Sequence, residues 1–94
     1  MNAEISELTV NFEEDGIVLV KEIDKVILSK GAWTTIIFRY QQWDKKTSQF
    51  SPDRFTIRRY KKIKNAYSQQ SKFNISSREQ AEKIVQALQL WLKD

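Results

Sequence analysis

Apolar and polar residues alternate with the two-residue period of β-strands through much of the first 75 positions. The segment "LTVNF" alternates weakly, and "EEDG" follows it with the turn signal Asp15-Gly16. The run "IVLVKEIDKVIL" is dominated by β-branched residues. We therefore expect two strands and a turn within residues 1–28. The apolar residues between Ile17 and Ile27 also satisfy helical spacing, so a helix remains an alternative there.

The strongest strand pattern lies at residues 33–43, "WTTIIFRYQQW", which is almost entirely β-branched, aromatic or glutamine. A short hairpin loop, "SKGA", precedes it, and the loop "DKKTSQFSP" reverses the chain after it. Because side chains alternate across a strand, Ile36, Phe38 and Tyr40 are predicted to share one face.

The next strand is predicted at residues 54–63, "RFTIRRYKKI", where apolar and basic residues occupy opposite faces. Phe55, Ile57 and Ile63 are expected to face the core. The other face, expected to be exposed, carries Arg54, Thr56, Arg58, Tyr60 and Lys62.

The hydrophobic period becomes that of a helix near the end of the chain. We expect "KNAYSQQS" to form a hairpin loop and "SKFNIS" to form a short strand that buries Phe73 and Ile75. Ser76 and Glu79 then have the spacing of a capping box, and apolar residues recur at steps of three and four from Ala81 to Trp91. The predicted fold is α+β: an antiparallel meander of four to five strands followed by one C-terminal amphipathic helix packed on one sheet face.

A chain of 94 residues is expected to form one domain, residues 1–94. It would consist of an acidic N-terminal hairpin (1–28), a basic sheet (33–75) and the helix (76–92). No apolar stretch reaches the length of a membrane span, and the acidic start does not resemble a signal peptide, so we expect a cytoplasmic protein with no membrane partner.

Cysteine and histidine are both absent from the sequence. The chain therefore cannot form disulfides or the usual zinc sites, and it lacks thiol nucleophiles and imidazole acid–base groups. We expect a protein that is not an enzyme and binds no cofactor.

The charges are divided unevenly along the chain. Residues 1–24 carry seven acids and one base, whereas residues 25–72 carry twelve bases and two acids. Ion pairs within the middle segment cannot neutralise so many bases, so its composition favours an anionic partner.

Basic and aromatic side chains are interleaved in this middle segment. Single-stranded nucleic acids are held by cations that neutralise phosphates and by flat side chains on which unpaired bases stack. The alternative is a solvated sheet face, because lysine and arginine also protect exposed strands from aggregation. Trp33 and Trp43 are open to a further interpretation, as core or dimer-interface residues. The candidate nucleic-acid-binding residues are Arg39, Trp43, Lys45, Lys46, Arg54, Arg58, Tyr60, Lys62, Lys64, Tyr67 and Lys72.

The basic strand "FTIRRYKK", the following "SKFNIS" and the closing "SREQAEKIVQAL" together resemble the positive-cofactor-four type of transcriptional coactivator, over about residues 33–92. The resemblance implies a strongly curved four-stranded sheet followed by a helix, a homodimer, and binding of single-stranded or melted DNA. The same plan is similar to the Whirly proteins and to purine-rich-element-binding repeats, which also bind single strands. The residues that carry the resemblance are Ile57, Arg58, Arg59, Tyr60, Ile75, Ser76, Glu79 and Gln80.

These observations lead to one hypothesis and one alternative. The hypothesis is a homodimeric protein that binds single-stranded DNA or RNA, as an accessory factor in transcription or DNA maintenance. The alternative is a non-enzymatic protein-interaction or assembly module, whose basic sheet binds an acidic protein.

Overall fold

The computed structural model describes residues 4–93. An antiparallel sheet and one C-terminal helix make up the fold, as the sequence predicts, and the strand interpretation of residues 17–28 is correct. Along the chain lie the 3-10 turn η1 (Ile5–Glu7), β1 (Phe12–Glu14), β2 (Ile17–Ser29), β3 (Trp33–Asp44), β4 (Gln49–Phe50), β5 (Arg54–Ile63), β6 (Ala66–Ile75) and α1 (Arg78–Leu92).

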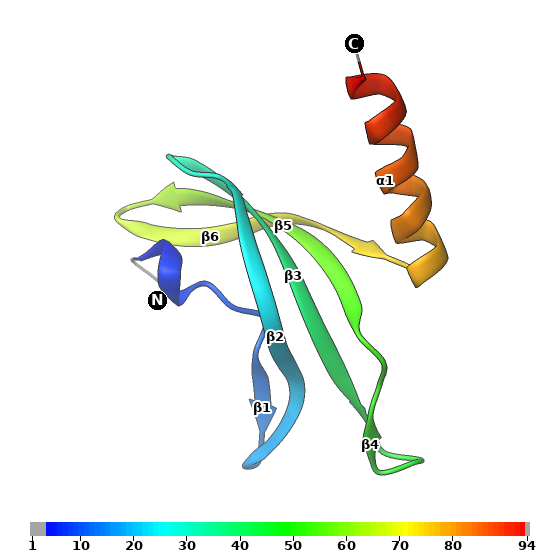
Figure 1. Cartoon of the computed structure of the whole chain (residues 1–94). Helices are drawn as coiled ribbons and strands as arrows, with labels where there is room; N and C mark the ends of the chain where they lie inside the picture. Colours follow the sequence, from blue (N-terminus) through cyan, green and yellow to red (C-terminus); the bar gives the residue numbers. More distant parts are fainter. Residues whose placement is uncertain (1–3, 94) are drawn as a thin grey trace.

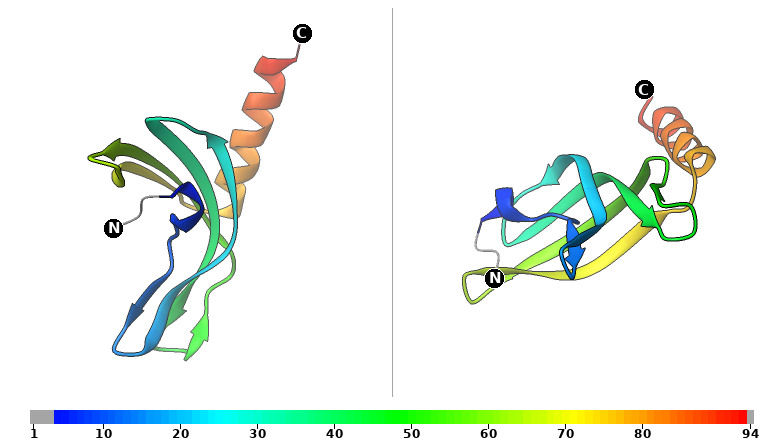
Figure 2. Two further views of the ribbon diagram at one scale, coloured as in Figure 1. Left: turned by 90° about the vertical axis from the view of Figure 1, so that its left-hand side faces the viewer. Right: turned by 90° about the horizontal axis from the view of Figure 1, so that it is seen from below.

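The sheet is a curled meander with the order β1-β2-β3-β5-β6 (Figure 1). The two-residue strand β4 pairs with the end of β3, inside the region predicted to be a loop. The register shifts twice between β2 and β3 and once between β5 and β6. Such bulges bend a strand and increase its twist, which accounts for the curl visible in Figure 2.

Two tight hairpins depend on residues with positive φ. Asp15 (52°) and Gly16 (78°) join β1 to β2, and Lys64 (51°) and Asn65 (65°) join β5 to β6. Positive φ at both central residues is the signature of a type I′ turn, whose twist matches that of the flanking strands. The predicted eight-residue loop after Ile63 is therefore wrong, because only two residues turn and β6 is a full ten-residue strand.

The core lies on the concave face of the sheet, beneath residues 4–11, which we call the N-terminal segment. Leu8 and Val10 form one buried cluster with Ile36, Phe38 and Tyr60. The described part of this segment crosses the concave side, as Figure 2 shows. Its apolar side chains are thereby removed from water together with those of the sheet.

Polar contacts hold the N-terminal segment against β2. The Lys25 ammonium donates to the carbonyl oxygens of Ser6 and Leu8, at 2.9 and 2.7 Å. The Asn11 side chain accepts a hydrogen bond from the Glu22 backbone N–H at 2.7 Å, and the Thr9 hydroxyl donates to the Glu22 carboxylate. The segment is thus fixed by direct bonds as well as by apolar burial.

The predicted faces of β5 are reversed in the structure. Tyr60 is only 5% exposed and Thr56 is fully buried, although both were assigned to the exposed face. The register pairs Thr56 with Phe38 and Tyr60 with Thr34, which places this face of β5 toward the concave core. The N-terminal segment covers that core. The opposite face of β5, which includes Ile63, therefore lies on the convex side of the sheet.

Helix α1 leaves the sheet at the end of β6 instead of covering a face (Figure 1). Its N-cap is Ser77, whose hydroxyl accepts from the Gln80 N–H at 3.0 Å, one residue later than the predicted capping box. The Gln80 side chain in turn accepts from the Ser76 N–H at 2.6 Å. No described residue of the helix is buried.

The core position of the N-terminal segment can be tested by Leu8→Ala. We expect the free energy of unfolding to fall by about 2–5 kcal/mol, because the change removes buried methyl groups and leaves a cavity. Urea denaturation measures this loss. Glu13→Ala, at an exposed position of β1, is the control and should change stability by less than about 0.5 kcal/mol. Equal effects of the two changes would mean that the segment does not contribute to the core.

Candidate nucleic-acid interface

The structure divides the predicted basic and aromatic residues among four places, so no single surface collects them all. Arg39 lies on the convex face of the sheet. Trp43, Lys45 and Lys46 lie at the β3–β4 end, and Lys64 lies in the β5–β6 turn. The concave side holds Arg54, Arg58, Tyr60, Lys62, Tyr67 and Lys72.

A groove of about 490 Å³ opens on the concave side, between the N-terminal segment and the strands. We call it the concave groove. Two cations, two aromatic rings and three side-chain amides line it: Arg58, Lys72, Phe12, Tyr40, Asn11, Gln42 and Asn74. No carboxylate is among its lining residues, although the Glu22 carboxylate lies beside it and accepts a hydrogen bond from the lining residue Thr9.

Arg58 and Lys72 lie directly opposite each other on β5 and β6. One terminal nitrogen of Arg58, Nη1, donates to the Gln69 amide oxygen at 3.0 Å. Its Nε is the one buried side-chain nitrogen or oxygen, among residues 4–93, that has no hydrogen-bond partner. The ion pairs found in this part of the chain, Arg39–Asp53 and Arg78–Glu82, leave both groove cations unpaired.

A second hollow, also of about 490 Å³, shares the lining residue Gln42 with the concave groove. It is lined by Arg54, Lys45 and Trp43, with Asp44 as its one carboxylate. Arg54 is directly opposite the groove residue Tyr40. Four of the sequence-predicted cations therefore line two hollows that share a residue: Lys72 and Arg58 line the first, and Arg54 and Lys45 line the second.

The two predicted stacking tyrosines are not available in this groove. Tyr60 is buried in the core, where loss of hydration raises the pKa of its phenol. Tyr67 packs against the same core, and its hydroxyl donates to the Gly31 carbonyl at 3.1 Å. Lys62 is held near this ring, with its ammonium 5.7 Å from the ring centroid.

Sequence reasoning missed the aromatic residues that do line the groove. Phe12 is 52% exposed and lies on β1, in the acidic hairpin, none of whose residues was among the candidates. Tyr40 was predicted only to share a face with Ile36 and Phe38, and it is half-buried. The alternation of the strands could have placed Tyr40 opposite Arg54, but no local pattern indicated that Phe12 would lie above the basic strands.

On the convex face, the predicted cation Arg39 is neutralised by an ion pair with Asp53. Arg39 donates to the Asp53 carboxylate, and Gln41 donates to the same group at 2.9 Å. The hydrogen bond from Gln41, followed by that from Arg39, lowers the pKa of Asp53 below its ordinary value. Arg39 is therefore already paired with a permanent anion near neutral pH.

The two tryptophans of β3 have different surroundings. Trp33 is 40% exposed, with the Arg59 guanidinium 4.2 Å and the Lys61 ammonium 5.3 Å from its ring centroid. Trp43 is half-buried and meets Phe50 edge to face, with centroids 5.1 Å apart. Trp33 is thus on the convex side beside cations, whereas Trp43 supports the β3–β4 hairpin.

No protein-family model, curated protein or solved structure matches this chain. Within residues 4–93, no helix combines the length and apolar character needed to cross a membrane. In the same range, no three acidic, cysteine or histidine side chains are grouped closely enough to hold a metal ion.

The raised pKa of Tyr60 predicts how stability changes in alkali. The folded state favours the neutral phenol, so its contribution is fully present below the unfolded value of about 10 and is lost as pH rises through the folded pKa. Urea midpoints measured between pH 9 and 11 should therefore fall more steeply for the wild type than for Tyr60→Phe. All other side chains are the same in the two proteins, so their contributions cancel in this comparison. Parallel curves would contradict the burial of this phenol.

Proposed function

We propose that this protein binds single-stranded nucleic acid in the concave groove and is not an enzyme. The observation that carries the proposal is the position of Arg58 and Lys72, neither of which is in an ion pair within residues 4–93, in one groove with the exposed ring of Phe12 and the half-buried ring of Tyr40. Cations and aromatic rings in one groove supply both terms of single-strand binding.

The backbone phosphates would lie along the four cations. Each neutralised phosphate releases condensed counterions, which makes affinity fall with salt. A phosphate oxygen beside Arg58 would pair with its guanidinium group, which has no carboxylate partner within residues 4–93. Arg54 and Lys45 would extend this path into the second hollow.

The bases would contact the other side of the groove. Phe12 and Tyr40 offer ring faces or edges, and Asn11, Gln42 and Asn74 carry amides that can bond to base edges. Bases inside a duplex are already stacked on one another, so this arrangement favours unpaired strands. The resemblance to the positive-cofactor-four type supports the same function at the level of fold, including action as a homodimer.

A second candidate function, a protein-interaction module, is favoured by a different observation. Apolar side chains remain exposed on α1 and on the convex face, among them Trp91 (73%), Val26 (56%) and Phe73 (50%). Contiguous apolar surface of this kind marks contact with another protein. The two functions use opposite faces and are compatible with each other.

The phosphate contacts can be tested by the double change Arg58→Ala with Lys72→Ala. Fluorescence anisotropy of a labelled oligo-dT strand, measured between about 50 and 200 mM salt, should show weaker binding and a salt slope smaller by about 1.4, or 0.7 for each lost contact. The control, Lys30→Ala with Lys83→Ala, removes the same charge at exposed positions outside the groove. Equal losses in both proteins would mean that only net charge matters.

The stacking contact can be tested by Phe12→Ala. Loss of one stacked base costs about 1–3 kcal/mol, so affinity for oligo-dT should fall roughly 5- to 150-fold with the salt slope unchanged. Ile17→Ala is the matched control, because Ile17 is similarly exposed (55%) on the same hairpin but lies outside the groove. Undiminished binding by Phe12→Ala would contradict the proposed base contact, and failure of the wild type to bind at 50 mM salt would contradict the function.

A further inference from the structure

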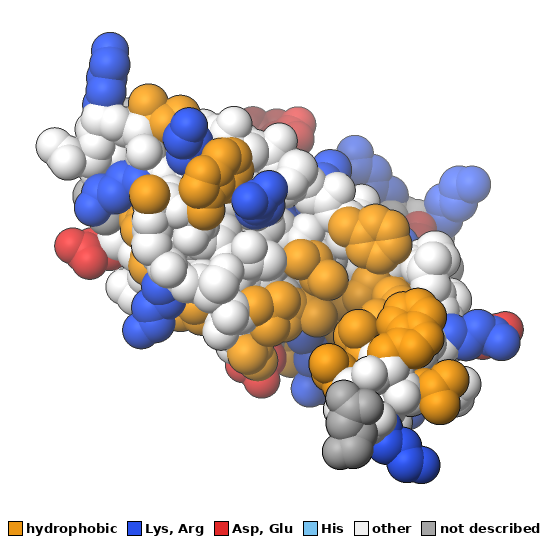
Figure 3. Space-filling model, turned by 90° about the horizontal axis from the view of Figure 1, so that it is seen from above, with side chains coloured by type: hydrophobic (Ala, Val, Ile, Leu, Met, Phe, Trp, Pro, Cys, Tyr) orange, Lys and Arg blue, Asp and Glu red, His pale blue; other side chains and the backbone are white. Residues whose placement is uncertain are grey.

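Three side chains at one end of the convex face form a cationic and aromatic cluster that the concave groove does not include. Trp33 on β3 lies directly opposite Lys61 on β5, and Arg59 is the preceding residue of β5 on the same face. The Arg59 guanidinium and the Lys61 ammonium lie 4.2 and 5.3 Å from the centroid of the Trp33 ring. We call these three residues the convex cluster. Figure 3 shows basic side chains around hydrophobic ones at the end of the molecule away from α1.

The convex cluster is available to an anion. Trp33 is 40% exposed, both cations are exposed, and neither belongs to an ion pair within residues 4–93. The segments 25–43 and 54–78, which supply the strands around the cluster, contain no aspartate or glutamate. A guanidinium that lies over an indole ring uses its flat face there, so its N–H groups remain free to bind an anion. The cluster thus offers two unpaired cations beside an exposed aromatic ring.

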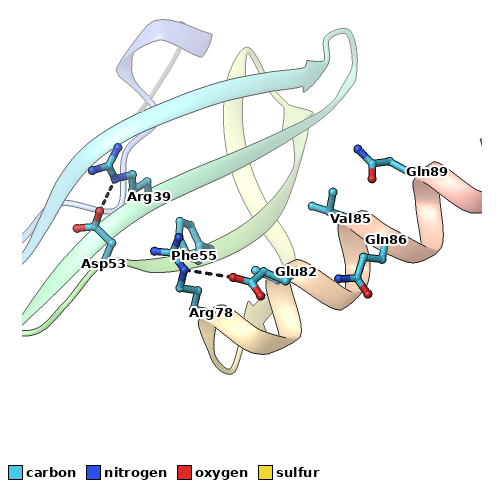
Figure 4. A pocket seen from close by; sticks show the side chains of 9 residues that line it. Arg39, Asp53, Phe55, Arg78, Glu82, Val85, Gln86 and Gln89 are labelled. Carbon is cyan, nitrogen blue, oxygen red and sulfur yellow. Dashed lines mark hydrogen bonds and ion pairs between the residues drawn. The ribbon is translucent and has the colours of Figure 1, made fainter.

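The part of the convex face beside α1 has a different character. A groove of about 670 Å³ lies there, between the helix and the sheet (Figure 4). Its two cations are each paired with a carboxylate, in the ion pairs Arg39–Asp53 and Arg78–Glu82. A polyanion on this face is therefore expected at the convex cluster and not beside α1.

The open edge of β6 gives one nucleic-acid strand access to both faces of the sheet. β6 is the last strand of the sheet on its side, and residues 68–74 are all exposed (Figure 1). Arg58 and Arg59 are adjacent on β5 but point to opposite faces, with Lys72 and Ser71 of β6 as their respective partners. A path around β6 from one arginine to the other covers about 20 Å, because it crosses one strand spacing on each face and the thickness of the sheet.

A bulge makes the same edge a poor place for another protein to add a β-strand. The register skips Gln70, because Arg59 pairs with Ser71 and Tyr60 pairs with Gln69. Such a bulge interrupts the row of backbone N–H and C=O groups that an added β-strand would need. The edge therefore favours a partner that does not pair with the protein backbone, as a nucleic acid does not.

We propose that the convex cluster is a second contact site for the same single-stranded nucleic acid, which leaves the concave groove beside Lys72 and continues around the edge of β6. Phosphates would pair with Arg59 and Lys61, and a base would stack against the exposed part of Trp33. The inference rests on the proposed function and extends it, because one bound strand then contacts both faces of the sheet. Affinity consequently depends on strand length, since a short strand occupies the groove alone.

Two lengths of labelled oligo-dT, about 6 and about 24 nucleotides, test this arrangement by fluorescence anisotropy between about 50 and 200 mM salt. The short strand can fill the groove but leaves too few nucleotides for the path around β6. Arg59→Ala with Lys61→Ala should weaken binding of the long strand and reduce its salt slope by about 1.4, while the affinity for the short strand stays within about twofold of the wild type. Retained binding of the short strand also shows that the variant is folded. The control, Lys83→Ala with Lys93→Ala, removes the same charge at exposed positions away from both sites and should affect the two lengths equally.

Contact between a base and Trp33 can be measured in a protein that keeps only this tryptophan, Trp43→Phe with Trp91→Phe. The long strand should quench its emission, and the short strand should not. Trp33→Ala in the natural chain should lower the affinity for the long strand roughly 5- to 150-fold, the effect of one lost stacked base.

The outcomes separate this inference from the function on which it rests. A wild type that binds neither strand at about 50 mM salt would overturn both. A wild type that binds the short strand through Arg58 and Lys72, but whose long-strand affinity is unchanged by loss of Arg59 and Lys61, would overturn only the second site. Equal losses for the two lengths would do the same. Binding of polyglutamate through Arg59 and Lys61, without any effect of these residues on the long strand, would overturn the inference in favour of an acidic protein.

Discussion

The burial of Leu8 and Val10 against the curled sheet is the constraint on which the other features depend. A sheet of this length has two faces, and an apolar cover decides which one becomes the interior. Here the cover comes from the N-terminal segment, so the concave face is the core and the C-terminal helix is left without a role in it. Three features follow from the use of the concave face as the core. Tyr60 points inward, Phe73 is half exposed although it was predicted to be buried, and the apolar side chains of α1 are uncovered.

The same segment forms one wall of the candidate site. Thr9, Asn11 and Phe12 lie beside Arg58 and Lys72 in the concave groove, although they come from the acidic end of the chain. The carboxylates of this region do not line the groove; Glu22, for example, accepts from the Thr9 hydroxyl instead. The acidic hairpin therefore borders the basic groove without forming an ion pair with it: Glu22 lies opposite the groove residue Tyr40, but it pairs with neither Arg58 nor Lys72.

Local patterns predicted the elements well and their faces poorly. The β-branched run of β3 and the helical spacing after Ser77 are properties of short segments, and both were recognised. The orientation of β5 was not, because Phe55 and Ile57 on one face compete with Thr56 and Tyr60 on the other. Contacts with residues far away in the chain decide such a case. Such contacts also bring Phe12 into the groove that Arg58 and Lys72 line, and no local pattern in the sequence indicated that position.

The long separation between Leu8 and its core neighbours has a consequence for how the chain folds. Leu8 belongs to a cluster whose other members extend to Tyr60, so closing this core requires a large loop to form first. During synthesis, Leu8 and Val10 are made before β5 and cannot be buried until β5 follows. Seven acids among positions 1–24 surround these apolar residues, and their like charges oppose association between copies of the exposed segment.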